Sequence, residues 1–214
     1  MIMTNTKIKI TILVILLIIF ILTAVLALTE TIKSFEISVY NLFAKLISPP
    51  FTEVVKIIAF AGSFWFLFVC AALLLIIPFT RIKYGCAAAV SALLSAGLNP
   101  LLKNIFRRVR PDNLLWLVSE TGYSFPSGHA QSCTAFFIAA AMLILCNVKN
   151  IKIKIPLFIA CILIPFLVGL SRIYLGVHYF GDVLAGWILG TAIALAVEIF
   201  YNIITEKLVN KEKK

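Results

Sequence analysis

The segment Ser171-Arg-Ile-Tyr-Leu-Gly-Val-His-Tyr-Phe-Gly-Asp182 is a polar, ionisable stretch between two long apolar runs. If a helix begins near His178, Asp182 lies one turn later on the same face, where its carboxylate can accept from one imidazole nitrogen and leave the other free. Arg172 precedes Gly176, where the backbone can turn, so its guanidinium can reach the same point. A histidine, a carboxylate and an arginine together indicate attack on an anion.

The rest of the chain is dominated by apolar residues. Of its 214 residues, 62% are hydrophobic and 13% are charged, and the mean hydropathy is +1.08. This composition is typical of a protein that crosses a membrane several times. The lysines fall between apolar runs and form no extended basic face, so the net charge of +10 indicates membrane topology rather than binding to nucleic acid.

The cysteines give no sign of a disulfide framework or a metal site. They are Cys70, Cys86, Cys133, Cys146 and Cys161. Their number is odd, no Cys-x-x-Cys pair occurs, and all five lie inside apolar runs. We expect them to be small buried thiols.

Six apolar runs are long enough to cross a membrane, since about 20 helical residues span the hydrocarbon layer of ~30 Å. We expect spans at about 8–28, 54–79, 84–102, 129–148, 155–171 and 183–204, with the longest polar loop over 103–128. A cleaved signal peptide is the alternative for the first run, but that run exceeds a usual signal core of about 15 residues and no clear Ala-x-Ala site follows. The predicted fold class is therefore all-α, a polytopic membrane protein with six transmembrane helices in a single domain over 1–214.

Residues 30–46, between the first two spans, carry a different pattern. Their apolar residues recur at helical spacing, namely Ile32, Phe35, Val39, Leu42, Phe43 and Leu46. This spacing predicts a short amphipathic helix on the membrane surface, ended by Ser48-Pro49-Pro50. An ordered loop with chance periodicity is the alternative.

Six spans place both termini on one side of the membrane. That side receives eleven of the 19 basic residues, namely Lys7, Lys9, Arg81, Lys83, Lys149, Lys152, Lys154, Lys207, Lys211, Lys213 and Lys214. The positive-inside rule makes it the cytoplasmic side of the cell membrane. The segments 103–110, 127–129 and 172–182 then all lie on the outer face.

Two further stretches on that face can bind an anion. Lys103 and Arg110 can contact phosphate oxygens, although basic residues beside a membrane also bind lipid headgroups, which we expect of Arg107 and Arg108. The second stretch, Pro126-Ser127-Gly128-His129, opens a helix whose exposed N–H groups form an anion cradle, and the Ser127 hydroxyl adds a donor. Read alone, this stretch is better explained as a helix cap, Ser127, beside an interfacial histidine, His129.

A His-x-x-x-Asp pair can also bind a metal ion. The charges expected on the outer face argue against a metal here. The basic residues are Lys103, Arg107, Arg108, Arg110 and Arg172, and the acidic ones are Asp112, Glu120 and Asp182. Such a pocket should repel a divalent cation and attract a dianion, so we expect phosphoryl transfer with no metal or other cofactor.

The ordered set Lys103-x6-Arg110-Pro111, Pro126-Ser127-Gly128-His129 and Ser171-Arg172-x5-His178-x3-Asp182 resembles the three-part signature of the type 2 phosphatidic acid phosphatase (PAP2) superfamily. Eleven fixed residues in this order arise by chance with a probability on the order of 10⁻⁸. The six spans and the surface helix after the first span are also similar to bacterial members. Phe180-Gly181 departs from the Pro-Thr that many relatives carry before the aspartate.

The resemblance implies a role for each matched residue. It implies that His178 is the nucleophile, that Asp182 orients it, and that His129 acts first as acid and then as base. It also implies that the phosphate oxygens are bound by Lys103, Arg110, Ser127, Gly128 and Arg172.

The partners implied are the lipid bilayer and a lipid phosphate or diphosphate, hydrolysed through a phosphohistidine. Undecaprenyl diphosphate suits an outward-facing site, with phosphatidylglycerol phosphate, phosphatidic acid, and dephosphorylation or phosphate transfer on lipid A as alternatives. The non-enzyme alternative is a transporter or a silent lipid-binding scaffold. Both would place charges in the middle of spans, whereas here they cluster at span ends on one face.

Overall fold

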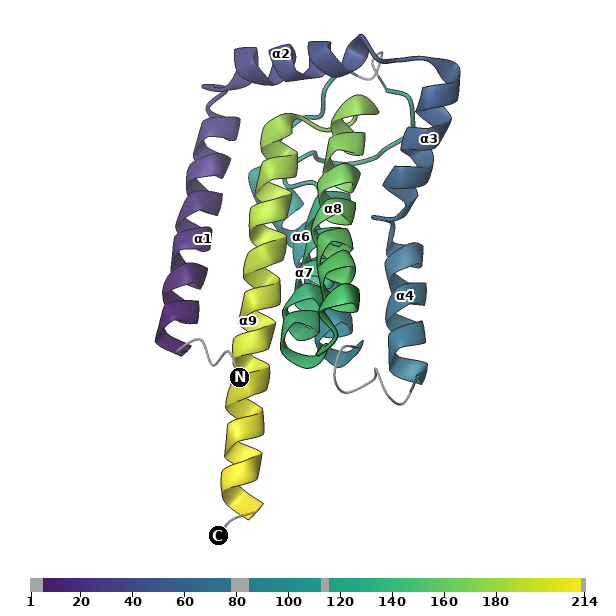
Figure 1. Ribbon diagram of the computed structural model, residues 1–214. Helices are drawn as coiled ribbons and strands as arrows, with labels where there is room; N and C mark the ends of the chain where they lie inside the picture. Colours follow the sequence, from purple (N-terminus) through teal and green to yellow (C-terminus); the bar gives the residue numbers. More distant parts are fainter. Residues whose placement is uncertain (1–5, 78–84, 113–115, 213–214) are drawn as a thin grey trace.

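The computed structural model describes residues 6–77, 85–112 and 116–212, which form a bundle of helices (Figure 1). In chain order these are α1 (Thr6–Leu28), α2 (Lys33–Ala44), α3 (Pro49–Phe60), α4 (Phe64–Ile76), α6 (Cys86–Phe106), α7 (Gly128–Asn147), α8 (Ile151–Tyr174) and α9 (Phe180–Glu212). No strand occurs within the described ranges. The predicted all-α class is confirmed.

Five of these helices, α1, α6, α7, α8 and α9, are long and apolar enough to cross a membrane. The α3–α4 pair qualifies only when its two helices are taken together, with a bend of 47° between them. Counting the pair as one span gives the six predicted spans of a multi-pass membrane protein. Some residues used in the span and charge predictions lie outside the described part of the chain: 78–79, Arg81, Lys83, Tyr84, Lys213 and Lys214.

The second span differs from the continuous helix that its apolar run predicts, because it is interrupted at Gly62. A Cβ on this residue would lie 2.4 Å from Cγ1 of Val168 and 3.3 Å from Cβ of His129. Only glycine therefore lets the bend approach α7 and α8 this closely. After the bend, the Ser63 hydroxyl caps α4 by accepting the N–H of Phe66 at 3.2 Å.

The surface helix α2 lies across one end of the bundle, and α1 begins and α9 ends at the opposite end (Figure 1). Ile32, Val39 and Phe43 pack against the buried core, as their spacing predicts. The other apolar residues of the pattern, Phe35, Leu42 and Leu46, are exposed. The apolar face is thus split between the bundle and the outer surface, which fits a helix that rests on the bundle at the membrane boundary.

Two helices, α6 and α9, have ends that differ from prediction. α6 continues through Pro100, so Lys103 lies in its last turn rather than in the following loop. An apolar environment favours the helix because backbone groups there need partners, and neighbouring groups can satisfy the carbonyl that the proline leaves unbonded. α9 begins at Phe180 and extends to Glu212, so His178 precedes the helix and the expected charged tail is helical.

Close contact between α7 and α9 fixes the base of the site. A Cβ on Gly186 would lie 2.9 Å from the Ser127 carbonyl oxygen, and one on Gly190 would lie 2.5 Å from that of Gln131. Small residues of this kind allow two helix backbones to approach. The five cysteines are free thiols. Cys133 and Cys161 are buried as expected, whereas Cys70 and Cys86 are partly buried and Cys146 is exposed.

Candidate active site

The residues that the sequence singles out lie at helix ends beside α2. Lys103 is in the last turn of α6, Ser127 and Gly128 open α7, Arg172 is in the last turn of α8, and Asp182 is in the first turn of α9. Two residues lie outside the helices: Arg110 follows α6 and His178 precedes α9. Because these helix ends share one end of the bundle, residues up to 79 positions apart in sequence come together.

His178 and Asp182 form a buried pair. Nδ1 of His178 lies 3.4 Å from Oδ2 of Asp182. This distance is longer than a normal hydrogen bond, and none of the described residues hydrogen-bonds to Nδ1. Oδ2 also accepts the N–H of Tyr179 at 3.0 Å, so the backbone before α9 holds the carboxylate in place.

Arg110 lies on the other side of the imidazole. Its Nη1 is 3.1 Å from Nε2 of His178 and donates to the Val177 carbonyl at 2.9 Å. Its Nε and Nη2 donate to the carbonyls of Gly122 and Thr121 at 3.0 and 2.9 Å. Since arginine has no acceptor, Nε2 must accept from it and Nδ1 must carry the proton toward Asp182. Nε2 is thus the unprotonated nitrogen, and its lone pair accepts from Arg110.

The surroundings keep this histidine neutral. Burial lowers the pKa of His178 to about 4, with Arg172 and Arg110 acting in the same direction and Asp182 opposing them. Burial also lowers the pKa of Arg110, while Glu120 and Asp182 oppose the shift. At neutral pH the site therefore combines an uncharged imidazole with charged guanidinium groups.

Arg172 and Arg110 share the carboxylate of Glu120. Arg172 is buried and forms an ion pair with Oε1 of Glu120, and Oε2 of the same carboxylate is 3.4 Å from Nη2 of Arg110. Nε of Arg172 has no hydrogen-bond partner among the described residues. A carboxylate that bridges two arginines occupies a position that a phosphate group can take. Among the residues that the structure describes, no group of three or more His, Cys, Asp or Glu side chains is arranged to hold a metal ion.

The start of α7 presents an unused donor. The Ser127 N–H donates to the Asp182 carbonyl at 3.0 Å, which ties α7 to α9. The Ser127 hydroxyl is buried, does not cap α7 and has no partner among the described residues. His129, two residues later, interacts electrostatically with the site groups Arg172, His178, Lys103 and Arg110. A buried hydroxyl without a partner, at a helix N-terminus, is suited to an anionic ligand.

Arg108 and Glu36 make contacts in the site that the sequence does not suggest. Arg108, expected to bind lipid headgroups, donates instead to Oδ1 of Asp182 and to Oε2 of Glu36, both at 2.6 Å. Glu36 lies on α2 and is buried, and sequence reasoning missed it. The available signal was its position on the inward face of α2, between Ile32 and Val39. Arg107 is exposed and donates to the Asn104 carbonyl of its own helix at 3.0 Å.

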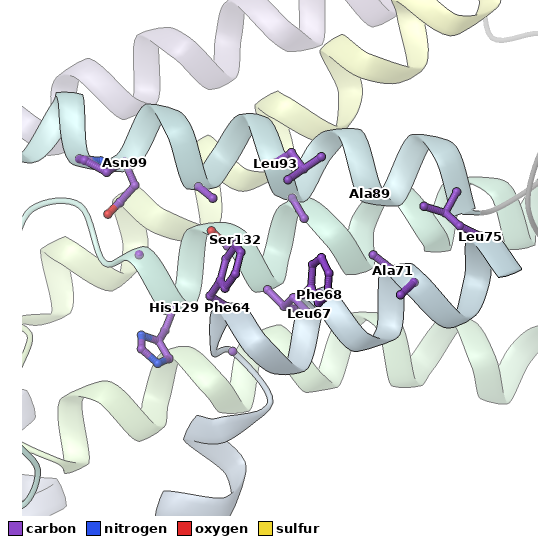
Figure 2. Close-up of a pocket in the computed structure, with 16 residues that line it drawn as sticks. Phe64, Leu67, Phe68, Ala71, Leu75, Ala89, Leu93, Asn99, His129 and Ser132 are labelled. Atoms are coloured by element: carbon purple, nitrogen blue, oxygen red, sulfur yellow. The ribbon is translucent and has the colours of Figure 1, made fainter.

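An apolar cavity of about 490 Å³ leads to His129 between α4, α6 and α7. Figure 2 shows Leu75 at one end of the cavity and His129 with Asn99 at the other. Phe64, Phe68 and Leu93, between these ends, are each more than half exposed on the outside of the bundle. The apolar surface that faces the membrane is therefore continuous with the polar site.

Comparison with known proteins places the chain among membrane phosphatases. The model of the PAP2 superfamily matches residues 84–206. The chain is 39% identical over 104 residues to phosphatidylglycerophosphatase B of Bacillus subtilis (strain 168), covering 48% of this chain and 51% of the relative. It is 37% identical over 134 residues to the undecaprenyl-diphosphatase of Sulfolobus acidocaldarius, covering 60% of each. The chain thus spans about half to three fifths of the length of these curated relatives.

Solved structures show the same architecture. The crystal structure of a transmembrane PAP2 type phosphatidylglycerolphosphate phosphatase from Bacillus subtilis superposes with a TM-score of 0.79 at 29% identity, covering 90% of this chain and 96% of that one. The crystal structure of Aquifex aeolicus LpxE gives a TM-score of 0.58 at 26% identity, covering 75% and 93%. The family model matches more than half of the residues of this chain, which therefore belongs to the PAP2 superfamily.

Proposed function

We propose that this protein is a membrane-integral lipid phosphatase that hydrolyses a phosphate or diphosphate monoester through a phosphohistidine on His178. One observation carries the proposal. The imidazole of His178 is neutral, its Nε2 lone pair points to the arginine side of the site, and Nδ1 faces Asp182. This is the form in which a histidine attacks phosphorus without prior loss of a proton.

In the first step the phosphate takes the place of Arg110 at Nε2. A bond forms between Nε2 and phosphorus, and the bond from phosphorus to the leaving oxygen breaks. The positive charge that develops on the imidazole is stabilised by Asp182 beside Nδ1. His129 gives its proton to the leaving oxygen, which departs with the lipid or the lipid monophosphate.

In the second step water releases the phosphate. His129, now unprotonated, accepts a proton from the water as its oxygen bonds to phosphorus. The bond between phosphorus and Nε2 breaks, and both histidines return to their starting states. The same residue thus acts as acid and then as base.

The negative charge of the phosphate is matched by fixed groups. We assign its oxygens to Lys103, Arg110, Arg172, the Ser127 hydroxyl and the Gly128 N–H. When the phosphate enters, it replaces the Glu120 carboxylate that bridges the two arginines in the free protein. Guanidinium and ammonium groups in these positions supply the charge stabilisation that magnesium gives in many kinases, so we propose that the reaction needs no metal.

The apolar cavity supports a lipid as the carrier of the phosphate. Its lining is almost wholly apolar, it opens between membrane-spanning helices, and it ends at His129, which we propose protonates the leaving oxygen. A lipid chain in this cavity would place its phosphate at the site. A soluble phosphate ester gains nothing from it, so lipid substrates should have the higher kcat/KM.

Two substrates are favoured within this class. Undecaprenyl diphosphate suits a site on the outer face of the cell membrane and is the substrate named for the Sulfolobus acidocaldarius relative. Phosphatidylglycerol phosphate is the second candidate, because the Bacillus subtilis structure that superposes with a TM-score of 0.79 carries that activity in its name.

The orientation proposed here has cytoplasmic termini and an outward-facing site in the cell membrane. The charge distribution supports it. Among the described basic residues outside the site, seven lie toward the end of the bundle opposite α2, namely Lys7, Lys9, Lys149, Lys152, Lys154, Lys207 and Lys211, against four toward the α2 end, namely Lys33, Lys45, Lys56 and Arg107. In a Cys146→Ser background, a membrane-impermeant maleimide should label Glu30→Cys in intact cells and Lys149→Cys only after lysis. The reverse pattern would overturn the orientation.

Phosphate release by purified, detergent-solubilised protein tests the activity. The substrates are undecaprenyl diphosphate, phosphatidylglycerol phosphate, phosphatidic acid and a soluble phosphate ester, all with EDTA present. We expect EDTA-resistant, vanadate-sensitive release from at least one lipid and none from folded His178→Ala. Absence of release from every lipid by the folded wild type, or near-normal release by His178→Ala, would refute the proposal.

A further inference from the structure

We propose that Glu36 and Arg108 position the Asp182–His178 pair, so that the surface helix α2 contributes to the reaction. This inference rests on the proposed phosphatase activity. Neither residue belongs to the motifs that the sequence singles out, and neither contacts the groups assigned to the phosphate. Their role would be to fix the residue that orients the nucleophile.

Arg108 lies between two buried carboxylates. Its Nη1 donates to Oδ1 of Asp182 at 2.6 Å, and its Nη1 and Nη2 donate to the two oxygens of Glu36 at 3.2 and 2.6 Å. The guanidinium also stacks on the Tyr179 ring, with Cζ 4.4 Å from the ring centroid. The planar group is therefore held from three directions.

The orientation of the Asp182 carboxylate depends on this contact. Oδ2 accepts the Tyr179 N–H and faces His178, whereas Oδ1 is held by Arg108. With Arg108 removed, the second oxygen loses its charged donor and the carboxylate can rotate away from Nδ1. The distance of 3.4 Å from Oδ2 to Nδ1 leaves little margin for such a movement.

Glu36 holds both Arg108 and the backbone before Asp182. Its Oε1 accepts the Gly181 N–H at 2.9 Å, in addition to the contacts with Arg108. A single side chain of α2 thus fixes the start of α9 and the guanidinium that holds Asp182. The exposed fraction of the Glu36 and Asp182 side chains is 0%, and that of Arg108 is 9%.

Burial of three charged groups is costly and would not be needed to hold helices together. Apolar residues of similar size can stabilise a buried contact as well as an ion pair does or better. The chain turn that delivers Arg108 is also specific. α6 ends at Phe106, and Arg107 adopts a left-handed conformation with φ of 48°. Arg107 consequently stays exposed while Arg108 points inward. Arg107 can therefore serve as the control position for substitutions of Arg108.

The test compares kcat and KM for phosphate release by Glu36→Gln, Arg108→Gln and the double variant. We expect kcat to fall about tenfold for Glu36→Gln and about a hundredfold for Arg108→Gln, with KM within about twofold of wild type. The double variant should match Arg108→Gln, because a glutamine at position 36 can still accept the Gly181 N–H and the remaining effect of Glu36 acts through Arg108. The controls are Arg107→Gln and Glu30→Gln, which make the same chemical changes at exposed positions and should keep wild-type kcat.

A further double variant, Glu36→Leu with Arg108→Met, separates positioning from structure. It replaces the Glu36–Arg108 ion pair by an apolar contact. It should therefore be thermally more stable in detergent than Arg108→Gln, which leaves the Glu36 carboxylate buried without its arginine, while kcat stays low. Recovery of kcat together with stability would show a merely structural role and overturn the inference. A raised KM with unchanged kcat would make Arg108 a phosphate ligand and overturn it as well.

The two proposals fail in different ways. A folded wild type that releases phosphate from no lipid refutes the phosphatase assignment, and the positioning role falls with it. An active wild type whose kcat is unchanged in both Glu36→Gln and Arg108→Gln refutes the positioning role alone.

Discussion

At the scale of single residues, the site places a neutral histidine, His178, between fixed charged groups. Arg110 faces Nε2 of His178 at 3.1 Å, and Asp182 lies 3.4 Å from Nδ1. The arrangement selects one tautomer, because the arginine can only donate. A buried, uncharged imidazole between opposite charges has consequences that can be measured apart from turnover.

The neutral state of His178 should make stability depend on pH. Its pKa in the folded protein is about 4, and a histidine in an unfolded chain titrates near 6.5. Between these values the unfolded chain binds a proton that the folded protein does not, so stability is fully present above about pH 6.5 and is lost as the pH falls toward 4.

The comparison that isolates this effect is between wild type and His178→Gln. The difference in their free energies of unfolding in detergent should shrink by up to ~1.4 kcal/mol for each pH unit lowered below about 6.5. A difference that stays constant from pH 7 to 4.5 would mean that the imidazole is not held neutral.

The Ser127 hydroxyl provides a second prediction. Because it has no partner in the described part of the free protein, removing it should not destabilise the fold, but the phosphate would lose a donor. We expect Ser127→Ala to lower kcat by about a hundredfold, the usual effect of losing one preorganised donor. Thr134→Val is the control, since the Thr134 hydroxyl is also buried in α7 and has no partner among the residues that the structure describes. Equal kcat values for the two variants would contradict the assignment.

The sequence predicts the motif residues of the site but not their supporting contacts. The motif spacings, with the resemblance they carry, single out the eight residues that lie at one end of the bundle. Glu36 and Arg108 are 72 positions apart, and Arg108 and Asp182 are 74 apart. Nothing in either local pattern specifies such a pairing, because it depends on where α2 rests on the bundle.

At the scale of the helices, the local sequence pattern predicts which segments are helical, whereas packing determines where a helix is interrupted. Long apolar runs predict the helices because a membrane requires every backbone group to be bonded within its own segment. The break between α3 and α4 follows instead from contact with α7 and α8. The run from 54 to 77 is apolar on both sides of the Gly62-Ser63 junction, and Gly62 stands out only when its neighbours in space are known.

The bend at Gly62 gives a prediction for the element that it positions. A methyl group there would lie 2.4 Å from Cγ1 of Val168 and 3.3 Å from the Cβ and carbonyl oxygen of His129. Gly62→Ala should therefore displace the start of α7, lowering both thermal stability and kcat, with kcat reduced by about tenfold or more.

Gly97→Ala is the matched control for this substitution. Gly97 lies within α6, and apart from its chain neighbours and the adjacent backbone of its own helix, no described atom lies within 4 Å of a Cβ built there. The change should leave kcat unaltered and raise stability slightly, by about 0.5–1 kcal/mol, because alanine favours a helix. Wild-type stability and kcat in Gly62→Ala would show that the close approach at the bend is not required.

The whole molecule places an apolar body between two charged ends, and the end beside α2 carries the site. Membrane-spanning helices supply the rigid scaffold, their ends beside α2 carry the charged groups of the site, and the cavity between α4, α6 and α7 joins the two environments. Composition and the positions of the charges predict this asymmetry. They do not predict the cavity, because its walls are ordinary apolar residues whose separation depends on the bend between α3 and α4.

The central claim is that phosphate is carried on His178, and trapping the phosphorylated protein tests it most directly. The purified protein would be mixed with a lipid substrate bearing ³²P in its terminal phosphate, quenched in alkali within milliseconds, and digested for peptide mapping. We predict an acid-labile, base-stable label on the peptide that contains His178, and no label in folded His178→Gln. Rapid phosphate release with no labelled protein at any quench time, or a label that persists in His178→Gln, would contradict the account.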